Sequence, residues 1–533
     1  MATIPETNPT PPNTADLAPV LSAHWALKPR HFVVCVFFCA GFVFVSSLPL
    51  LDWSVWRQLG VGRWILAHGS LPLDDPTRPL GEAAGFVNGN WLSQLALAWA
   101  HRTGGPQGVA NLLTVLVVGN LAVLARVAYR QTGGVWLMLT GVVLSLLISA
   151  GFGFFPLADV FGKLCFVLLF SLLLTVPKLS RTHPHTRKTR RTVQFLRHTV
   201  PFMQSCSHDP SRKAGGSRWW VGPALVWLAT AILFAAWANL HGSYLMGIAV
   251  LLCFAVAYGG EVVWQLRSLR LAAADDVLQA YVVLAATAIV ASLLNPHGLE
   301  LARTILSAFG ETVHSPSPAW AGVDLDGLRG LVFFGSLGVL AILLLTNRPQ
   351  ISATDVLLPA GFAAAVLITR QAQSWYALVY VFVAMPHFAH FVGQGRWWGA
   401  TLFGRALLPS QRRRKKSVTI RRSIAELGRA TLPDQRFLET AGSAPRLTAW
   451  SFLFTMLSGL AVYCAFCFAP GAQVLLGGHP RPLGELVGSD EAAQATEWLG
   501  QYAPSARVFA LPRWADLLVG LAGDGVSAMM TSS

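Results

Sequence analysis

Apolar runs long enough to cross a lipid bilayer recur along most of this chain. A helix needs about 20 apolar residues to span the hydrocarbon layer, and there it satisfies its own backbone hydrogen bonds. The sequence therefore predicts an all-α polytopic membrane protein with about eleven transmembrane helices. The predicted spans are 31–50, 108–128, 134–153, 157–177, 219–238, 244–265, 277–294, 329–346, 354–370, 374–393 and 448–470. Because only Gly151, Gly153 and Pro156 punctuate the segment between the third and fourth runs, these two runs also fit one interrupted pair.

The amount and the distribution of charge agree with this class. Of the 533 residues, 53% are hydrophobic and only 12% are charged, whereas soluble domains carry about 25% charged residues. The basic residues behind the net charge of +15 concentrate in two loops, 178–218 and 394–447. Basic loops of membrane proteins stay in the cytoplasm, so the excess charge argues for topology and against nucleic-acid binding. With eleven spans, the N-terminus is expected inside and the C-terminus outside.

Several segments outside the spans have a predictable character. Residues 1–30 are polar and rich in proline and threonine, which predicts a disordered cytoplasmic tail before a transmembrane domain at 31–470. The first outer loop, 51–107, is too long for a simple connection, and long ordered loops often carry function. The non-cytoplasmic tail, 471–533, should contain a strand at Arg507–Ala510. The tail either packs on the membrane domain or is an incomplete soluble domain, since it is too short for a large core of its own.

Two amphipathic stretches of the first outer loop carry tryptophan on one helical face. Such helices lie in the bilayer interface, with tryptophan at the level of the lipid headgroups. The first face consists of Trp53, Trp56 and Trp64, and the second consists of Trp91, Leu95 and Trp99.

Carboxylates of the first outer loop are the first candidates for chemistry. Asp52 directly follows the first span, where a carboxylate is costly unless it has a partner or a task. It is either a general base or metal ligand facing a substrate, or the N-cap of a helix that begins at Trp53. Asp74 and Asp75 lie in a proline-bounded turn. Neighbouring carboxylates can bind a cation or share a proton, although they are also common turn and capping residues.

Two Asn-x-His-Gly sequences, Asn239–Gly242 and Asn295–Gly298, each end a span at the predicted outer face. Histidine at that depth can bind phosphate, relay a proton or ligate a metal. Helix termination explains the glycine and the asparagine but does not require the histidine. His241 and His297 are therefore candidate functional residues.

Arg370 ends the ninth predicted span on the outer face, against the positive-inside trend. An arginine there can bind a phosphate with two parallel hydrogen bonds, or it can simply extend its charge to the interface. Weaker candidates lie in the outer segment 295–328 and are Glu311, His314, Asp324 and Asp326. The sequence contains no phosphate-binding P-loop, zinc-protease motif or dinucleotide-binding fingerprint in a credible context.

The order of residues in the first outer loop resembles that of bacterial membrane proteins related to the GT-C glycosyltransferases, such as protein mannosyltransferases and aminoarabinose transferases. The similarity lies in Asp52-Trp53-x-x-Trp56-x-x-Leu59-Gly60-x-Gly62-Arg63, in Leu71-Pro72-x-x-Asp75-Pro76 and in Asn90-Trp91-Leu92-Ser93-Gln94. The two histidine turns are also similar, and the resemblance covers roughly residues 31–393. Departures are Gln58, where relatives often have histidine, and Phe155-Pro156-Leu157, where an arginine-proline-glutamine is expected.

The resemblance implies a GT-C-like fold and a transferase of the bacterial inner membrane. The donor would be a sugar linked to a polyprenyl phosphate, and the acceptor would be an envelope molecule on the outer face. Asp52 matches the position of the catalytic aspartate in such enzymes, and Asp75, Trp91 and Gln94 are candidate substrate-binding residues in the same stretch.

The leading hypothesis is therefore a lipid-linked-sugar glycosyltransferase. Asp52 would deprotonate the acceptor or hold a divalent cation, and His241, His297 and Arg370 would stabilise the departing phosphate. The alternatives are a transporter or flippase of a lipid-linked precursor and a catalytically inactive membrane scaffold. Transporters place polar groups near the bilayer midplane, whereas here the spans are largely apolar at their centres, apart from Asp159 and Lys163, a potential i, i+4 pair.

A shared phosphate–sugar site makes a geometric prediction. Asp52, His241 and Arg370 should line one outward-facing cavity, within roughly 15 Å of one another, because bridging waters extend the reach of a sugar phosphate.

Overall fold

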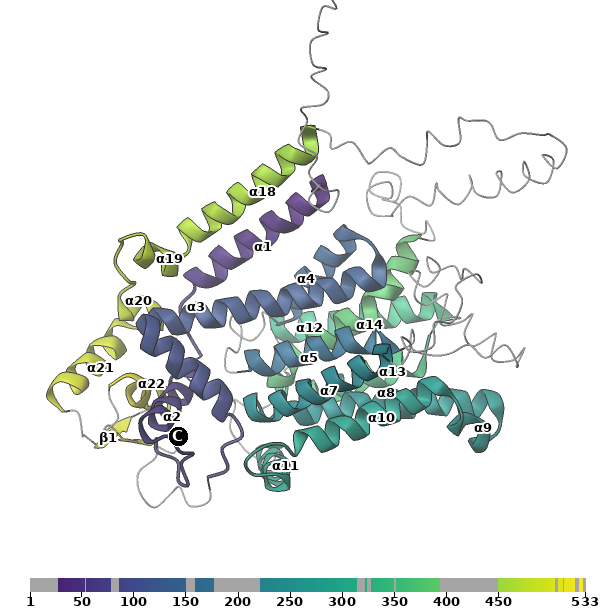
Figure 1. Cartoon of the computed structure of the whole chain (residues 1–533), viewed down its shortest axis with the longest axis horizontal. Coiled ribbons are helices and arrows are strands. Elements are labelled where there is room, and N and C mark those ends of the chain that lie inside the picture. The colour runs from purple at the N-terminus through teal and green to yellow at the C-terminus, as the bar shows by residue number, and fades with distance from the viewer. Residues whose placement is uncertain are drawn as a thin grey trace, which may run out of the picture. The chain divides into compact units, whose positions relative to one another are not determined.

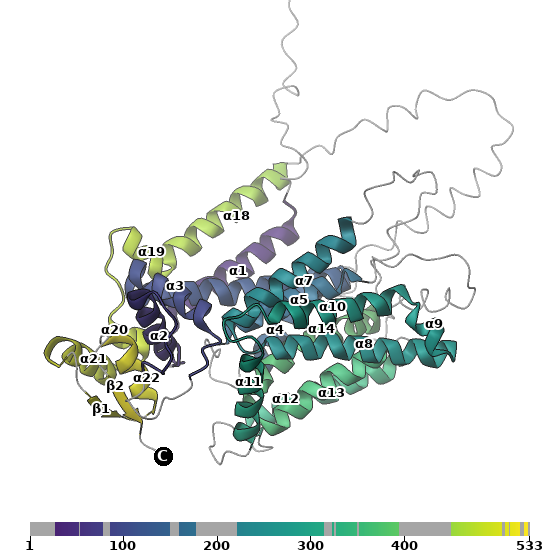
Figure 2. The same cartoon turned by 60° about the horizontal axis from the view of Figure 1, so that its bottom comes forward.

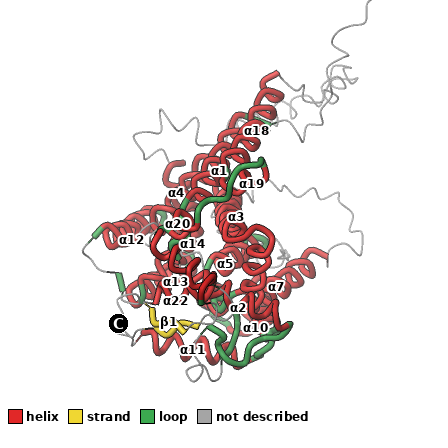
Figure 3. The backbone as a smooth tube through the Cα atoms, turned by 90° about the vertical axis from the view of Figure 1, so that its left-hand side faces the viewer, coloured by secondary structure: helices red, strands yellow, loops and turns green. Residues whose placement is uncertain are grey.

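A computed structural model of the chain describes residues 27–52, 54–77, 86–149, 159–176, 221–313, 322–323, 327–348, 351–393, 449–503, 507–510, 512–522 and 527–530. The described chain is almost entirely helical (Figures 1 and 3). It forms two compact units, one of residues 1–43 and 412–468 and the other of 44–411 and 469–533.

All eleven predicted spans coincide with helices. Five of the described helices are long and apolar enough to cross a membrane, and shorter apolar helices occupy the other predicted positions. The chain is thus an all-α polytopic membrane protein. The helices that match the spans are α1 (Pro29–Ser47), α3 (Trp91–Thr132), α4 (Val135–Ser149), α5 (Val160–Leu173), α7 (Val221–Leu240), α8 (Tyr244–Leu266), α10 (Asp276–Ser292), α12 (Leu328–Thr346), α13 (Ala353–Ile368), α14 (Gln373–Gly393) and α18 (Ala449–Phe468).

The first unit pairs α18 with most of α1. The rings of Phe32 and Phe454 lie 6.0 Å apart, and the thiol of Cys35 lies 3.7 Å from the carbonyl oxygen of Ser458. Both helices are apolar on all sides, which is the pattern expected of helices that contact lipid.

In the second unit, α14 is the most buried of the five long span helices (Figure 2). Its side chains from Gln373 to Met385 are buried on every side, and it contacts α3, α4, α5, α12 and α13. Gln373 donates a hydrogen bond of 2.9 Å to the carbonyl oxygen of Ile148 at the end of α4. The amide nitrogen of this buried residue is therefore paired, whereas its Oε1 has no hydrogen-bond partner among the described residues.

The first outer loop folds into α2 (Ser54–His68) and the first part of α3. Helix α3 bends at Gly104 and Gly105, which leave the helical conformation just before Pro106. The bend separates the predicted second amphipathic stretch from the span that follows it. Trp99 is 66% exposed on this first part, as an interfacial residue would be.

The prediction that Trp56 lies at headgroup level is wrong. Its side chain is fully buried in a core with Val55, Leu59 and Leu517. The reason is the C-terminal tail, which covers this face of α2, so the face is apolar for packing against protein and not for contact with lipid. Trp53 lies outside the described residues.

The C-terminal tail packs on the membrane domain, which decides between the two predicted outcomes. It contains α19 (Pro470–Leu475), α20 (Leu483–Val487), α21 (Asp490–Tyr502), β1 (Arg507–Ala510), α22 (Pro512–Leu521) and β2 (Ser527–Met530). The predicted strand is confirmed as β1, which pairs in parallel with β2. Helix α22 packs so closely on α2 that a Cβ at Gly520 would lie 2.3 Å from the carbonyl oxygen of Trp56. Arg481 further joins the tail to Gln107 of α3, at 2.9 Å.

Three shorter helices complete the second unit. They are α9 (Leu269–Ala273), α11 (Leu299–Val313) and the 3₁₀ turn η7 (Arg370–Ala372). Helix α9 follows α8, α11 follows the second Asn-x-His-Gly sequence, and η7 joins α13 to α14.

Polar contacts join helix ends at two places in the second unit. At one end of the bundle, Asp159 precedes α5 and His241 follows α7. At the other end, His387 near the end of α14 lies 3.4 Å from Asp355 at the start of α13, and Asn347 after α12 donates to the His387 carbonyl oxygen at 3.2 Å. The basic loops at 178–218 and 394–447 lie outside the described residues, so the sidedness of the two ends stays a prediction.

Candidate functional site

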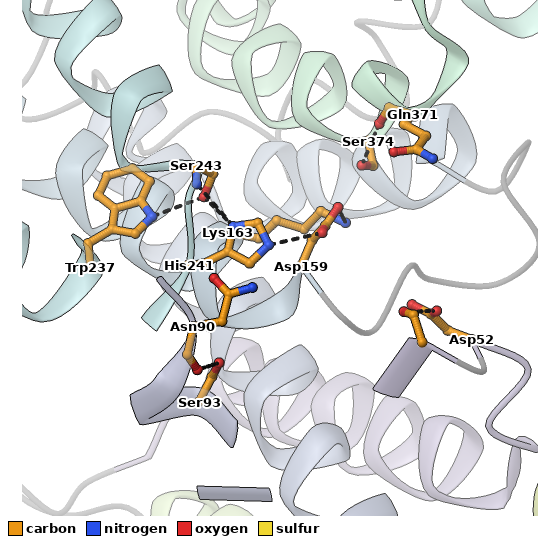
Figure 4. A network of polar contacts seen from close by, with 11 residues as sticks. Asp52, Asn90, Ser93, Asp159, Lys163, Trp237, His241, Ser243, Gln371 and Ser374 are labelled. Atoms are coloured by element: carbon orange, nitrogen blue, oxygen red, sulfur yellow. Dashed lines mark hydrogen bonds and ion pairs between the residues drawn. The ribbon is translucent and has the colours of Figure 1, made fainter. Parts of the chain in front are cut away.

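Asp159 is the centre of the polar contacts at the first of these ends (Figure 4). It comes directly before α5, and side chains from α5, α14 and the turn after α7 contact its carboxylate. His241 Nε2 lies 3.2 Å from Oδ1, Lys163 Nζ lies 4.0 Å from Oδ2, and the Trp375 side chain donates a hydrogen bond. Three segments distant in the sequence are thus joined at one carboxylate, which is still 26% exposed.

The hydrogen bonds of His241 define its tautomer. The backbone N–H of Ser243 donates to Nδ1 at 3.1 Å, and the Ser243 hydroxyl lies 2.8 Å from the same nitrogen. Trp237 Nε1 donates to that hydroxyl at 3.0 Å, so the hydroxyl proton is directed at Nδ1. A ring nitrogen that accepts an N–H carries no proton, which places the proton of the neutral imidazole on Nε2, facing Asp159. His241 therefore orients Asp159 and offers no free lone pair to a substrate.

Lys163 connects this carboxylate to the first outer loop. Its side chain is buried, its ammonium lies 5.8 Å from the centre of the Trp375 ring, and it interacts electrostatically with Asp52 as well as with Asp159. Asp52 is half-buried and accepts a hydrogen bond of 2.6 Å from the Ser54 hydroxyl in the first turn of α2. We call Asp52, Asp159, Lys163 and His241 the Lys163 cluster.

Gly162 allows the two sides of the cluster to approach. A Cβ at this position would lie 2.3 Å from the Ser243 hydroxyl and 2.9 Å from His241 Nδ1. Because no side chain stands on this face of α5, the turn that carries His241 packs directly on the helix that carries Lys163. Figure 4 also shows Asn90, at the start of α3, with its amide directed toward His241 and Asp159.

The side chain of Asp75 is bound by other residues of the protein. Its buried carboxylate forms an ion pair with Arg57 of α2 and accepts hydrogen bonds from the Thr77 N–H, at 3.0 Å, and hydroxyl, at 2.5 Å. Burial alone would raise the pKa of Asp75, but the Arg57 guanidinium and the Thr77 donors outweigh it and lower that pKa. The predicted substrate residue thus holds the turn after α2 closed. Asp74, its neighbour, is exposed.

Trp91 and Gln94 are also held by the protein. The Trp91 indole donates to Asn239 Oδ1 at 2.7 Å, and the Asn239 amide donates to the carbonyl oxygens of Ala235, at 2.7 Å, and Leu294, at 2.8 Å. This asparagine of the first Asn-x-His-Gly sequence therefore ties the first outer loop to the ends of α7 and α10. Gln94 is buried and accepts a hydrogen bond of 2.8 Å from Asn88.

The second Asn-x-His-Gly sequence forms a local turn. Asn295 donates to the carbonyl oxygens of Ser292, at 2.7 Å, and Gly298, at 3.1 Å, and Gly298 has a positive φ of 53°. These are the contacts of helix termination. Among the described residues, the buried His297 Nε2 has no hydrogen-bond partner, and no contact joins His297 to the Lys163 cluster.

Arg370 is half-buried in η7, and within the part of the chain that the structure describes its side chain forms no hydrogen bond or ion pair. Its neighbour Gln371 accepts a hydrogen bond of 3.3 Å from Ser374 beside the cluster (Figure 4). Of the three residues expected to meet, His241 contacts Asp159, and Asp52 interacts electrostatically with Lys163, which pairs with Asp159. Arg370 directly precedes Gln371, which lies beside the cluster. Of the weaker candidates, His314, Asp324, Asp326 and the Glu311 side chain lie outside the described residues.

The donor set does not fit a divalent cation. Within the described ranges, no group of three or more His, Cys, Asp or Glu side chains is arranged to hold a metal. The Asp159 carboxylate already faces N–H donors from His241 and Trp375, and the Lys163 ammonium would repel a second cation.

Asp159 and Lys163 stand out in the sequence only as a potential i, i+4 pair within an apolar span, yet both belong to the candidate site. The available signal was their charge, because an ionisable residue in an apolar span is costly and marks a functional site more often than not. The pair is confirmed at 4.0 Å, and its partners come from other segments.

Comparisons with known proteins find only a low structural similarity to the protein described below. No protein-family model and no curated protein matches the sequence. The chain is similar to the Archaeoglobus fulgidus oligosaccharyltransferase tethered with an acceptor peptide, at a TM-score of 0.47 and 11% identity over 95% of this chain and 64% of that chain. For the apo form the TM-score is 0.37, at 12% identity over 94% and 64% of the two chains. For the complex with an inhibitory peptide and a dolichol-phosphate it is 0.36, at 11% identity over 93% and 64%. This chain therefore spans 64% of the length of the structures it matches, and no residue role is taken from the likeness.

Proposed function

We propose that this chain is a membrane glycosyltransferase that moves a sugar from a polyprenyl-phosphate-linked donor to an envelope acceptor on the outer face of the inner membrane. The observation that carries the proposal is the Lys163 cluster. Asp52, which directly follows the first span, interacts electrostatically with the buried Lys163. Lys163 pairs with Asp159, and Asp159 contacts His241 from another segment. Ionisable residues within an apolar bundle are costly and are functional candidates by default, so four of them at the helix ends favour a site.

The chemistry assigns a separate task to each carboxylate. The acceptor hydroxyl oxygen forms a bond to the anomeric carbon, the bond from that carbon to the phosphate oxygen breaks, and the lipid phosphate leaves with the electron pair. Asp52, which is half-buried and lies outside the His241 hydrogen-bond chain, takes the acceptor proton. Asp159 is held by His241 and Trp375 and positions Lys163, since its lone pairs already accept hydrogen bonds.

A transporter is less well supported by the same contacts. Alternating access requires the polar groups to change partners during the cycle, whereas His241 is fixed by Ser243, Trp237 and Asp159 in one tautomer. The cluster also lies at the ends of α5 and α7 rather than at their centres.

Replacement of Asp52 tests the proposal. Asp52→Asn keeps the size and the Ser54 hydrogen bond but removes the base, so we expect transfer to fall by about two orders of magnitude or more with unchanged protein in the membrane. Asp74→Asn, an exposed carboxylate of the same loop, is the matched control and should leave transfer unchanged. The assay compares envelope glycans of a deletion strain complemented with each variant. A deletion strain with the same glycans as its parent would end the glycosyltransferase proposal, and labelled-lipid transport in liposomes that ignores Asp52→Asn would replace it with a flippase.

A further inference from the structure

The position of Lys163 raises a question that the proposed function leaves open, namely which cation balances the two carboxylates and the donor phosphate. The ammonium lies 4.0 Å from Asp159 and also interacts with Asp52. Trp375 contacts both members of the pair, because it donates to Asp159 and its ring lies 5.8 Å from the ammonium. Lys163 is thus held at the site by groups on two sides, and its aliphatic stem is buried in the bundle.

A count of charges at the site shows which group can act as its cation. Asp52 and Asp159 contribute two negative charges, Lys163 contributes one positive charge, and His241 is neutral in the tautomer fixed by Ser243. The N-termini of α5 and α14 also lie here, since Asp159 directly precedes α5 and Trp375 is in the first turn of α14. Each helix start contributes about half a positive charge. The C-terminus of α7, directly before His241, contributes about half a negative charge and offsets part of this. Lys163 is therefore the one full positive charge of the cluster.

Coordination of a metal would disturb this arrangement. A divalent cation bound by both carboxylates would have to displace the N–H donors of His241 and Trp375 from Asp159 and also expel the buried ammonium. Expelling the ammonium is unfavourable because its aliphatic stem is packed in the bundle and because removing a buried charge from its carboxylate partner is costly.

We infer that the Lys163 ammonium is the resident cation of the site, that it binds the phosphate of the lipid-linked donor, and that phosphate binding needs no divalent metal. This inference rests on the proposed function, because it assigns the donor's phosphate to the same cluster. As the sugar–phosphate bond breaks, negative charge grows on the phosphate, and a fixed ammonium stabilises that charge without reorganisation.

Binding of undecaprenyl phosphate to the purified protein in detergent tests the inference, with undecaprenol as the probe that lacks the phosphate. The readout is the ligand-dependent rise of the unfolding midpoint, measured in Mg²⁺ and in EDTA. The wild type should bind the phosphate equally, within about twofold, in both buffers, and it should bind undecaprenol more weakly. Lys163→Met should lose at least about tenfold in affinity, while Lys163→Arg should lose less because it keeps the charge.

Two further variants keep the test decisive. Removal of Lys163 alone leaves Asp159 without its cation, so the double variant Asp159→Asn/Lys163→Met, which removes both charges, serves if the single variant does not fold. His387→Gln breaks a comparable buried pair, that of His387 with Asp355. His387 lies twelve residues after Trp375 in α14, which is about 18 Å along the helix axis. It should bind undecaprenyl phosphate like the wild type and controls for general destabilisation.

Three outcomes would overturn the inference. Binding that disappears in EDTA and returns with Mg²⁺ would make a metal the cation, and the glycosyltransferase proposal would survive. Unchanged affinity in Lys163→Met or in the double variant would place the phosphate elsewhere. Binding of undecaprenol as tight as that of undecaprenyl phosphate would show that the lipid tail, and not the phosphate, is recognised.

Discussion

Replacement of Gly162 by alanine tests the geometry of the Lys163 cluster without replacing any of its ionisable groups. The added Cβ would lie 2.3 Å from the Ser243 hydroxyl, whereas ordinary contacts lie at 3.4–4 Å. Helix α5 or the turn after α7 must therefore move by about 1 Å. The hydroxyl cannot yield by itself, because Trp237 and His241 Nδ1 both hold it.

The expected effects on stability and on activity differ in size. Overpacking costs about 1–3 kcal/mol, but alanine regains up to about 1 kcal/mol of helix propensity over glycine. The free energy of unfolding should therefore fall by about 0–3 kcal/mol. A misplacement of 1 Å at a reacting centre costs about 100-fold in rate. Transfer activity in membranes of equal protein content is thus the sensitive measurement, with the unfolding midpoint measured beside it.

Gly338→Ala is the matched control for this variant. Gly338 lies in α12, and a Cβ there would meet no atom within 4 Å. Its replacement should leave both activity and stability near their wild-type values. If Gly162→Ala were as active as Gly338→Ala, the close approach of α5 to the His241 turn would have no part in the function, and the assignment of the cluster as a site would be refuted.

Two other predictions concern the first outer loop and the topology. Asp75→Asn should lower the free energy of unfolding at neutral pH by about 1–3 kcal/mol, toward the lower end because Arg57 is 30% exposed. Arg57 and Thr77 lower the pKa of folded Asp75. The stabilisation is therefore present above the unfolded-state pKa and is lost as the pH falls through the folded-state pKa. The difference in unfolding midpoint between the variant and the wild type should thus vanish in acid. A midpoint difference that is the same at neutral and acid pH would contradict the ion pair. For topology, cysteines placed at Asp74, which is exposed, and in the tail after Ala469 should react with an impermeant thiol reagent from outside, whereas those at Arg190 and Arg413 should not. Labelling of position 190 but not of position 74 would invert the topology.

The sequence alone was enough to predict the helices of this protein, for a simple physical reason. A segment in lipid must satisfy its own backbone, so each apolar run of about 20 residues has one available structure whatever its neighbours are. The strand at Arg507–Ala510 was also predictable, because it depends on a local pattern. The approximate position of the candidate site was also predictable, because a charged residue such as Asp52 is energetically costly beside a membrane span.

The fate of individual side chains depended on the tertiary structure. Trp56 has the pattern of an interfacial residue, but the tail beyond residue 469 covers it, and no local pattern reports a partner 450 residues away. Asp75 and Asp52 are two carboxylates of one loop with similar sequence signals. Only the fold gives Asp75 an arginine from α2 and gives Asp52 a buried lysine from α5.

The two Asn-x-His-Gly sequences show the same division. Sequence predicts a turn at the end of a span for both, and both form one. Asn239 joins three segments and His241 orients Asp159, whereas Asn295 bonds only within its own turn. The difference arises because Gly162 brings α5 against the first turn. The sequence thus determined which segments enter the membrane and which residues are costly there, and the packing of helices distant in the chain decided which of those residues meet.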